Sequence, residues 1–353
     1  MFRLFLVCFL ILQFLYSNSQ IPQGYYNSAQ GLSGVALKQA LHNIIKNHNS
    51  ISYNSLWSYF QQTDKKSNGK VWDMYSDNPT GTLPYEYTFS TDQCGDYNAE
   101  GVCYNREHSW PQSWFNSSTP MVSDLFHLYP TDGYVNGKRG DNPYGDVATT
   151  TWTSQNGSKL GYCGDSGYSG LVFEPIDEYK GDFARTYFYM SVRYYTEDGS
   201  WQTNNMVTKS EIKEWALKAL YEWHLADTVS QKEINRNNAV YNIQSNRNPF
   251  IDHPEYVELV WNTILGVKNI SETSFSFNIY PNPTTDNVNI SINSKTDFSS
   301  AQLNIFNNLG QKVFSKKLKE KSDNINVSSL FSGVYIASLT INNNTFFKKL
   351  IIE

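Results

Sequence analysis

The feature that most constrains the fold is a change in the character of the chain near residue 270. Between residues 25 and 265, several segments repeat apolar side chains with the period of an amphipathic helix. Residues 268–276 are rich in Ser, Thr and Asn, which is typical of a linker. Beyond them, stretches such as Val288-Asn-Ile-Ser-Ile alternate apolar and polar side chains between turn residues. We therefore expect an α+β domain with many helices over 20–267 and a small β-sandwich over 277–353.

Local patterns place elements within the first domain. An apolar stripe beginning near Ser33 predicts a helix. Thr208 and Glu211 have the pattern of a capping box ahead of another helix, and Pro254 suits the first residue of a third. The alternation in Tyr85–Ser90 predicts a strand. The segments with helical periodicity are 32–48, 182–195 and 209–226.

The first nineteen residues have the pattern of a signal peptide. Arg3 precedes an apolar run that ends at Tyr16, and small polar residues follow it. The run is shorter than the roughly 18 apolar residues that a membrane-spanning helix needs. We therefore expect an exported protein without a membrane span.

Export determines how the cysteines are interpreted. Cys8 would leave with the signal peptide, and Cys94, Cys103 and Cys163 would remain in an oxidising compartment. The short turn-like loop between Cys94 and Cys103 favours a disulfide there, with Cys163 either free or the true partner of one of them. No cysteine or histidine spacing predicts a zinc site.

The charge of the chain restricts how it could bind a polyanion. The formal net charge is −5; residues 271–353 hold eight basic and six acidic residues, so with Arg3 set aside residues 4–270 carry −8. Nucleic-acid-binding proteins usually present a basic surface. A nuclease of this composition would therefore depend on local positive groups and a bound divalent cation.

Two neighbouring segments, 105–115 and 124–139, concentrate the residues suited to phosphodiester hydrolysis. The reaction needs a base for water and a cation to neutralise charge on the phosphoryl oxygens. His108 suits the base, because histidine is largely neutral near pH 7. Glu107 and Asn136 offer the oxygen ligands that Mg²⁺ prefers, with Ca²⁺ or Mn²⁺ as alternatives. Glu107 and His108 would lie on an extended strand and Asn136 on a short helix, an arrangement that resembles the ββα-metal nucleases.

Four ordered sequence blocks together resemble the bacterial endonuclease I family over about residues 30 to 265. The resemblance implies cleavage of DNA with little sequence specificity and 5′-phosphate products, and it leaves cleavage of RNA open. It also implies that His108 is the base and that Glu107 and Asn136 bind one Mg²⁺. The blocks are Asn105-Arg-Glu-His-x-x-Pro-x-Ser-Trp-Phe115, Asp124-Leu-x-His-Leu-x-Pro130 with Asn136-Gly-x-Arg139, Phe173-Glu-Pro-x-Asp-Glu-x-Lys-Gly-Asp-x-Ala-Arg185, and Arg247-Asn-Pro-Phe-Ile-Asp-His-Pro254.

The chain departs from the family in one respect. Periplasmic members carry an inserted, cysteine-containing stretch that supplies an arginine near the cleaved phosphate, and this stretch is missing here. Arg106, Arg139 and Arg185 are therefore equal candidates for stabilising the transition state.

The remaining polar residues of the blocks have supporting or structural interpretations. Asp124 and Glu174 are candidates for orienting the metal ligands, with structural salt bridges as the alternative. His127 is expected to be a buried, hydrogen-bonded histidine that organises its loop. His253 is expected at a helix cap or in the core.

The C-terminal part resembles the sorting domain of the type IX secretion pathway, on the stretches Tyr280-Pro-Asn-Pro-Thr, Ser332-Gly-Val-Tyr and the terminal Lys348-Lys-Leu-Ile-Ile-Glu. The secretion machinery is therefore an expected partner beside the nucleic acid, and we expect a secreted or cell-surface monomer. Two other classes of protein fit the sequence less well. An adhesin on an inactive nuclease scaffold conflicts with the intact Glu107, His108 and Asn136, and a zinc protease would need a His-Glu-x-x-His helix, which is absent.

Overall fold

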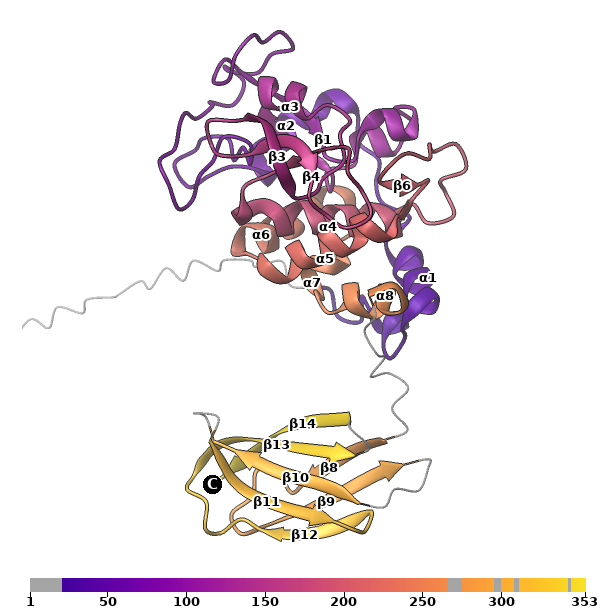
Figure 1. Ribbon diagram of the computed structural model, residues 1–353, viewed down its shortest axis with the longest axis vertical. Helices are drawn as coiled ribbons and strands as arrows, with labels where there is room; N and C mark the ends of the chain where they lie inside the picture. Colours follow the sequence, from indigo (N-terminus) through magenta and orange to yellow (C-terminus); the bar gives the residue numbers. More distant parts are fainter. Residues whose placement is uncertain (1–20, 266–274, 295–299, 308–310, 342–343) are drawn as a thin grey trace, which may run out of the picture. The chain divides into compact units, whose positions relative to one another are not determined.

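The computed structural model describes residues 21–265, 275–294, 300–307, 311–341 and 344–353. They form two compact units, one before and one after the stretch 266–274 (Figure 1). The predicted signal peptide and most of the predicted linker lie outside these ranges. Within them, no helix is both long and apolar enough to span a bilayer.

The first unit is built around helix α4 (Asp177–Arg193), in which every residue from Gly181 to Arg193 is buried. Helices α1 (Gly34–Ile45), α5 (Glu214–Ala226) and α7 (Pro249–Asp252) pack against it. Its tyrosines and phenylalanines lie at the centre of a core rich in aromatic side chains, and burial of such large side chains is a major source of stability. The other helices are α2 (Leu56–Thr63), α6 (Gln231–Gln244) and α8 (Tyr256–Leu265).

A strand pair followed by a short helix carries the Arg-Glu-His motif and Asn136. Strand β1 (Tyr104–His108) pairs antiparallel with β2 (Leu128–Asp132), so that Glu107 lies opposite Tyr129 and His108 opposite Leu128. Helix α3 (Gly133–Arg139) begins directly after β2. Asp132 caps it, because its Oδ1 accepts a hydrogen bond of 2.8 Å from the Val135 N–H.

Two further antiparallel sheets complete the first unit. One contains β3 (Val147–Thr153), β4 (Lys159–Cys163) and β5 (Leu171–Glu174) in that order. The other is a hairpin of β6 (Val207–Thr208) and β7 (Glu211–Ile212). The unit is therefore α+β, as the sequence predicts.

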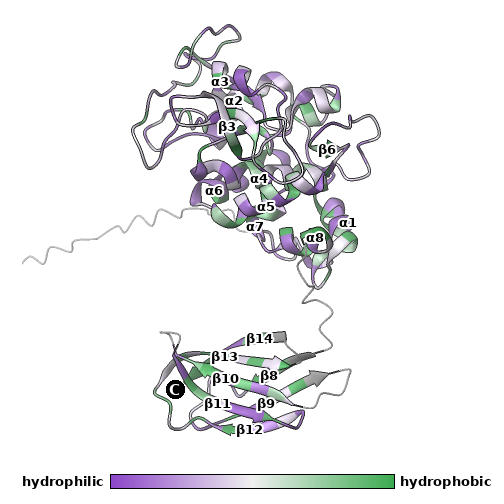
Figure 2. Ribbon diagram, viewed as in Figure 1, coloured by the Kyte–Doolittle hydropathy of each residue, from purple (hydrophilic) through white to green (hydrophobic). Residues whose placement is uncertain are grey.

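The second unit consists of strands in two antiparallel sheets, ordered β11-β10-β13-β14 and β12-β9-β8. Inward-facing side chains from both sheets form one hydrophobic core, and Figure 2 shows the alternation of hydrophobic and hydrophilic residues along the strands. This layering has the pattern of a sandwich. The strands are β8 (Phe275–Tyr280), β9 (Asn287–Ser294), β10 (Ala301–Phe306), β11 (Lys312–Leu318), β12 (Ser322–Asn326), β13 (Gly333–Ile341) and β14 (Asn344–Ile352).

Two predicted helix starts in the first unit are wrong. Thr208 and Glu211 do not cap a helix; they pair across the β6–β7 hairpin, whose turn is made by Lys209 at φ 55°. The capping box instead lies at Ser230 and Glu233, at the start of α6. Pro254 precedes α8 by two residues, and the proline at a helix start is Pro249 in α7.

The predicted strand Tyr85–Ser90 does not form: residues 85–88 have no regular secondary structure, and Phe89 and Ser90 lie in a turn, with Ser90 at φ 65°. The Tyr87 carbonyl accepts one hydrogen bond from the Val71 N–H at 3.0 Å. The alternating aromatic side chains instead pack as a small cluster with Tyr104 and Trp57. The alternation therefore reflects side-chain burial rather than a ladder of backbone hydrogen bonds.

The cysteines follow the favoured pairing. Cys94 and Cys103 form a disulfide with their Cα atoms 5.7 Å apart, and Cys163 is free and buried. Because Cys103 directly precedes β1, the disulfide anchors a loop at the start of the strand that carries Glu107 and His108.

Candidate active site

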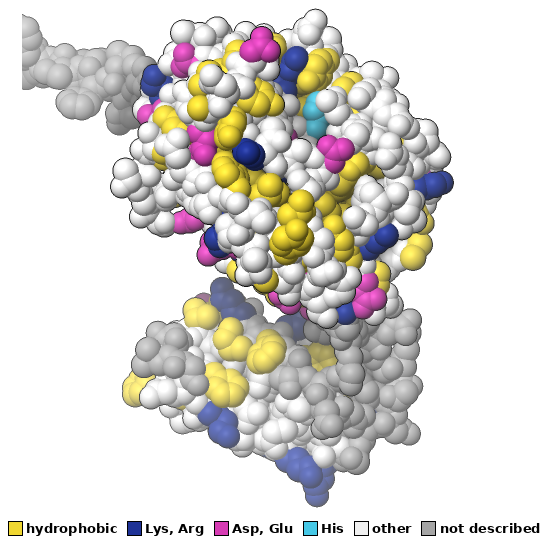
Figure 3. Space-filling view, turned by 45° about the horizontal axis from the view of Figure 1, so that its top comes forward, with side chains coloured by type: hydrophobic (Ala, Val, Ile, Leu, Met, Phe, Trp, Pro, Cys, Tyr) yellow, Lys and Arg dark blue, Asp and Glu magenta, His cyan; other side chains and the backbone are white. Residues whose placement is uncertain are grey.

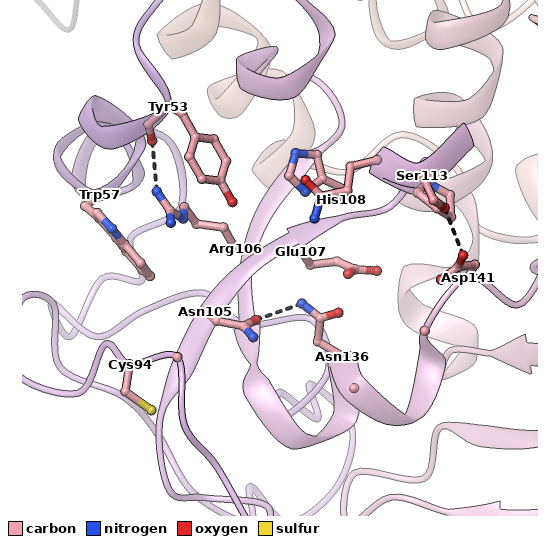
Figure 4. A pocket seen from close by; sticks show the side chains of 15 residues that line it. Tyr53, Trp57, Cys94, Asn105, Arg106, Glu107, His108, Ser113, Asn136 and Asp141 are labelled. Carbon is pink, nitrogen blue, oxygen red and sulfur yellow. Dashed lines mark hydrogen bonds between the residues drawn. The ribbon is translucent and has the colours of Figure 1, made fainter. Parts of the chain in front are cut away.

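A cavity of about 510 Å³ opens where β1, α3 and the short helix η2 (Tyr53–Ser55) meet (Figure 4). Aromatic, amide and charged side chains line the cavity, and Arg106 is the one Lys or Arg among these lining residues. On the molecular face shown in Figure 3, Lys and Arg side chains are scattered among Asp and Glu without forming a continuous basic patch. The lining residues are Tyr53, Trp57, Cys94, Gly95, Asn105, Arg106, Glu107, His108, Pro111, Gln112, Ser113, Asn136, Gly137, Gly140 and Asp141.

His108 lies at the end of β1 with one ring nitrogen engaged. Its Nε2 is 3.1 Å from the carbonyl oxygen of Val122. A carbonyl can only accept, so Nε2 carries the proton and Nδ1 of the neutral ring is unprotonated. Burial, followed by the neighbouring His127 and the arginines, lowers the pKa of His108 to about 3. The imidazole is therefore neutral near pH 7 and can accept a proton at Nδ1, to which no described group donates a hydrogen bond.

Glu107 is held in a buried carboxylate pocket. Its Oε1 accepts hydrogen bonds from the Tyr75 hydroxyl at 2.9 Å and from Arg139 Nη1 at 3.1 Å. Among the described residues, no hydrogen-bond donor reaches Oε2. Burial raises the pKa of Glu107, although Arg139 and Tyr75 act in the opposite direction. A cation at Oε2 would therefore stabilise the ionised carboxylate.

Asn136 presents its amide oxygen to the same cavity. It lies on α3, and its Nδ2 donates a hydrogen bond of 2.7 Å to Asn105 Oδ1 on β1. This contact fixes the amide with its nitrogen toward β1, which leaves Oδ1 as the atom free to bind a ligand. Sequence reasoning assigned no role to Asn105, although it lies within the motif 105–115.

These oxygen atoms fit a hard divalent cation better than zinc. Glu107 and Asn136 offer one carboxylate and one amide oxygen, and Mg²⁺ typically binds through few protein oxygens and keeps several waters. In the part of the chain that the structure describes, no three His, Cys, Asp or Glu side chains group as a metal-binding cluster. The donor set is therefore compatible with a partly hydrated Mg²⁺ and incompatible with a closed four-ligand zinc site.

Arg106 lies on the opposite wall of the cavity from Asn136 (Figure 4). Its guanidinium carbon is 3.7 Å from the ring centre of Tyr53 and 4.6 Å from that of Trp57. Its Nη1 donates to the Tyr53 carbonyl at 3.0 Å. Tyr53 and Trp57 lie about fifty residues before the motif, outside every recognised block, so no sequence motif pointed to them.

The other two arginine candidates do not line the cavity. Arg139 is fully buried behind Glu107 and also donates to the backbone carbonyls of His108 and Ser109 at 3.0 and 2.6 Å. Arg185 is fully buried elsewhere, with its Nε and Nη2 paired to the carboxylate of Glu233. Arg106 is thus the candidate with a guanidinium in the cavity. Arg139 lies outside the cavity lining and contacts the site through Glu107.

Three further candidates also lie outside the cavity lining. The carboxylate of Asp124 is buried and accepts four hydrogen bonds. His127 is buried with Nε2 2.7 Å from the Met121 carbonyl, and its ring centre lies 5.5 Å from that of His108. Glu174 forms ion pairs with Lys180 and Lys159 at 2.8 and 3.6 Å. His127 therefore packs beside His108 from within the core. The hydrogen bonds of Asp124 and the ion pairs of Glu174 are of the kind that stabilise the fold.

Two families of proteins match this chain. Residues 33–255 match the family described as Endonuclease I, and residues 278–353 match the secretion system C-terminal sorting domain. The chain is 35% identical over 243 residues to an extracellular ribonuclease of Bacillus amyloliquefaciens, across 67% of this chain and 78% of that protein. An extracellular ribonuclease of Bacillus subtilis is 34% identical with the same coverage of both chains. Endonuclease-1 of Buchnera aphidicola is 28% identical over 132 residues, across 37% of this chain and 45% of that protein.

Proposed function

Because the chain belongs to the endonuclease I family, we propose that it is a metal-dependent nuclease that cuts DNA and RNA with little sequence specificity. Membership of the family makes it an endonuclease that hydrolyses phosphodiester bonds. The C-terminal sorting domain makes it a secreted protein of the type IX pathway.

The observation that carries the proposal is the state of His108. Its Nε2–H is bound by the Val122 carbonyl, so the basic Nδ1 is available in a cavity that also contains the oxygens of Glu107 and Asn136. His108 would remove a proton from a water molecule as the water oxygen attacks phosphorus. The bond from phosphorus to the 3′ oxygen would break and a water molecule would protonate that oxygen, which leaves a 5′-phosphate and a 3′-hydroxyl.

Glu107 and Asn136 would hold one Mg²⁺ through Oε2 and Oδ1. The bound ion would neutralise charge on the phosphoryl group and assist departure of the 3′ oxygen. The Arg139 and Tyr75 contacts keep the Glu107 carboxylate in place, and the Asn105 contact keeps the Asn136 oxygen directed away from β1. Strands β1 and β2 with helix α3 would then constitute a ββα-metal core.

Arg106 would stabilise the negative charge that grows on the phosphoryl oxygens. It is the candidate arginine that lines the cavity, and the Tyr53 and Trp57 rings restrict its guanidinium. Preorganised donors of this kind are effective because they need no rearrangement during the reaction. An arginine from within the Arg-Glu-His motif would thereby replace the one supplied by the missing insert.

The test is cleavage of supercoiled plasmid and of single-stranded RNA by the mature protein with Mg²⁺ or with EDTA. Cleavage should require Mg²⁺, and His108→Ala should lower its rate by about 10² to 10⁴-fold. His253→Ala is the matched control, because His253 lies outside the cavity and contacts Glu255 and Tyr256. Undiminished cleavage by His108→Ala would disprove the assigned base, and full activity in EDTA would disprove the metal requirement.

A further inference from the structure

Four planar groups form a column along one wall of the cavity. The Trp57 ring lies against the Arg106 guanidinium, which lies against the Tyr53 ring. The Tyr53 ring is stacked with His108, with centres 5.9 Å apart and planes 18° from parallel. Figure 4 shows the Tyr53 ring between Arg106 and His108. Tyr53 therefore contacts both side chains to which the proposed function assigns proton transfer and charge stabilisation.

The backbone around Tyr53 is tied to the same two groups. The Tyr53 carbonyl accepts the hydrogen bond from Arg106 Nη1. Two residues earlier, the Ile51 carbonyl accepts a bond of 2.6 Å from Ser123 Oγ. Ser123 follows Val122, whose carbonyl binds His108 Nε2. The segment 51–53 and the turn Met121–Ser123 (η4) are thus linked to each other, and each contacts the His108 imidazole.

We propose that Tyr53 is a positioning residue of this active site, whose ring holds the His108 imidazole and the Arg106 guanidinium at a set separation. The inference rests on the proposed function. The single hydrogen bond at His108 Nε2 does not fix the tilt of the imidazole ring, which therefore depends on the side chains packed against it. The long side chain of Arg106 has many rotamers. A misplacement of about 1 Å in a reacting group can cost ~10²-fold in rate.

The ring rather than the hydroxyl should carry this role. Within the described parts of the chain, no hydrogen bond reaches the Tyr53 hydroxyl, whereas the ring makes both stacking contacts. Tyr53→Phe should therefore retain kcat within about twofold. Tyr53→Leu removes the planar surface and should lower kcat by ~10²-fold.

The experiment measures kcat and the half-saturating Mg²⁺ concentration on a single-stranded DNA oligonucleotide, using the full mature chain. Tyr53→Leu should leave the Mg²⁺ half-saturation unchanged, because neither Glu107 nor Asn136 belongs to the column. Tyr162→Leu is the control, since Tyr162 is 52% exposed on β4 and lies outside the cavity. Thermal unfolding of each variant separates a positioning defect from a folding defect.

Wild-type kcat in Tyr53→Leu would overturn the inference. Equal losses in Tyr53→Phe and Tyr53→Leu would also overturn it, because the hydroxyl would then carry the role. If Tyr53→Leu fails to fold, Ser123→Ala decides: it releases segment 51–53 without touching the column. A fall in kcat of about tenfold would support the inference, and wild-type kcat would overturn it. Failure of the proposed function would show differently, as an inactive wild-type protein.

Discussion

Replacing Arg139 by Met should destabilise the first unit strongly, because it breaks a buried ion pair without removing the buried charge. Arg139 is fully buried, and its side chain donates to Glu107 Oε1, the His108 carbonyl, the Ser109 carbonyl and the Tyr187 hydroxyl. Met fills a similar volume but donates nothing. The loss of one partner of a buried pair costs about 3–5 kcal/mol, so the free energy of unfolding should fall by that amount.

The identity of the partner can be tested with a double-mutant cycle. Glu107→Gln replaces the carboxylate by a neutral group, so Arg139→Met should cost several kcal/mol less in the Glu107→Gln background than alone. Arg139 lowers the pKa of Glu107 against the effect of burial, so its removal lets burial raise that pKa further. The penalty should therefore be smaller at pH 5 than at pH 8, since protonation removes the buried charge.

Urea unfolding in EDTA, followed by tryptophan fluorescence, measures the effect in the first unit, because all nine Trp residues lie between positions 57 and 261. The control is Arg106→Met, which removes a half-buried arginine of the same site that pairs with no carboxylate among the described residues. It should cost only about 1 kcal/mol. A cost below about 1 kcal/mol for Arg139→Met, as exposed pairs show, would refute the buried-pair interpretation.

Two further predictions concern the metal and pH. Asn105→Ala removes the acceptor that orients Asn136 and should raise the half-saturating Mg²⁺ concentration in the cleavage assay by about 10- to 100-fold; an unchanged Mg²⁺ titration would contradict this. Burial, and then the charge of Arg185, lower the pKa of His224 to about 4. The folded state therefore binds fewer protons than the unfolded state between pH 6.5 and 4, and His224 should cost up to about 3 kcal/mol of stability as pH falls across this window. In urea unfolding, the free energy of unfolding of His224→Gln should depend less on pH than that of the wild type. The same pH dependence in both proteins would exclude this role of His224.

Elements with strong local signals were predictable from the sequence. The helix near 34–45 and the short helix after Asp132 appear as expected, because periodicity and capping act within a few residues. A local pattern that fits more than one kind of secondary structure gave a wrong prediction. Thr208 and Glu211 have the spacing of a capping box, but the left-handed turn at Lys209 places them across a hairpin, and Glu211 instead pairs with Lys38.

In the candidate site too, the motif residues were predictable and the contacts between distant segments were not. The Arg-Glu-His motif and Asn136 were visible in the sequence and do meet in one cavity, because β1 pairs with β2 and α3 follows directly. The choice among three arginines was not visible. Arg185 lies inside a motif block, yet its partner Glu233 comes 48 residues later and draws it away from the cavity.

The sequence by itself therefore determined the family, the two-part organisation, the secretion route and the residue types available for hydrolysis. These depend on contiguous motifs and local periodicity. Only the tertiary structure decided which arginine lines the cavity, which nitrogen of His108 is unprotonated, and that Tyr53 lies between Arg106 and His108. Each of these depends on contacts between segments far apart in the chain, such as Tyr53 with Arg106 and Val122 with His108, whose pairing is decided by packing.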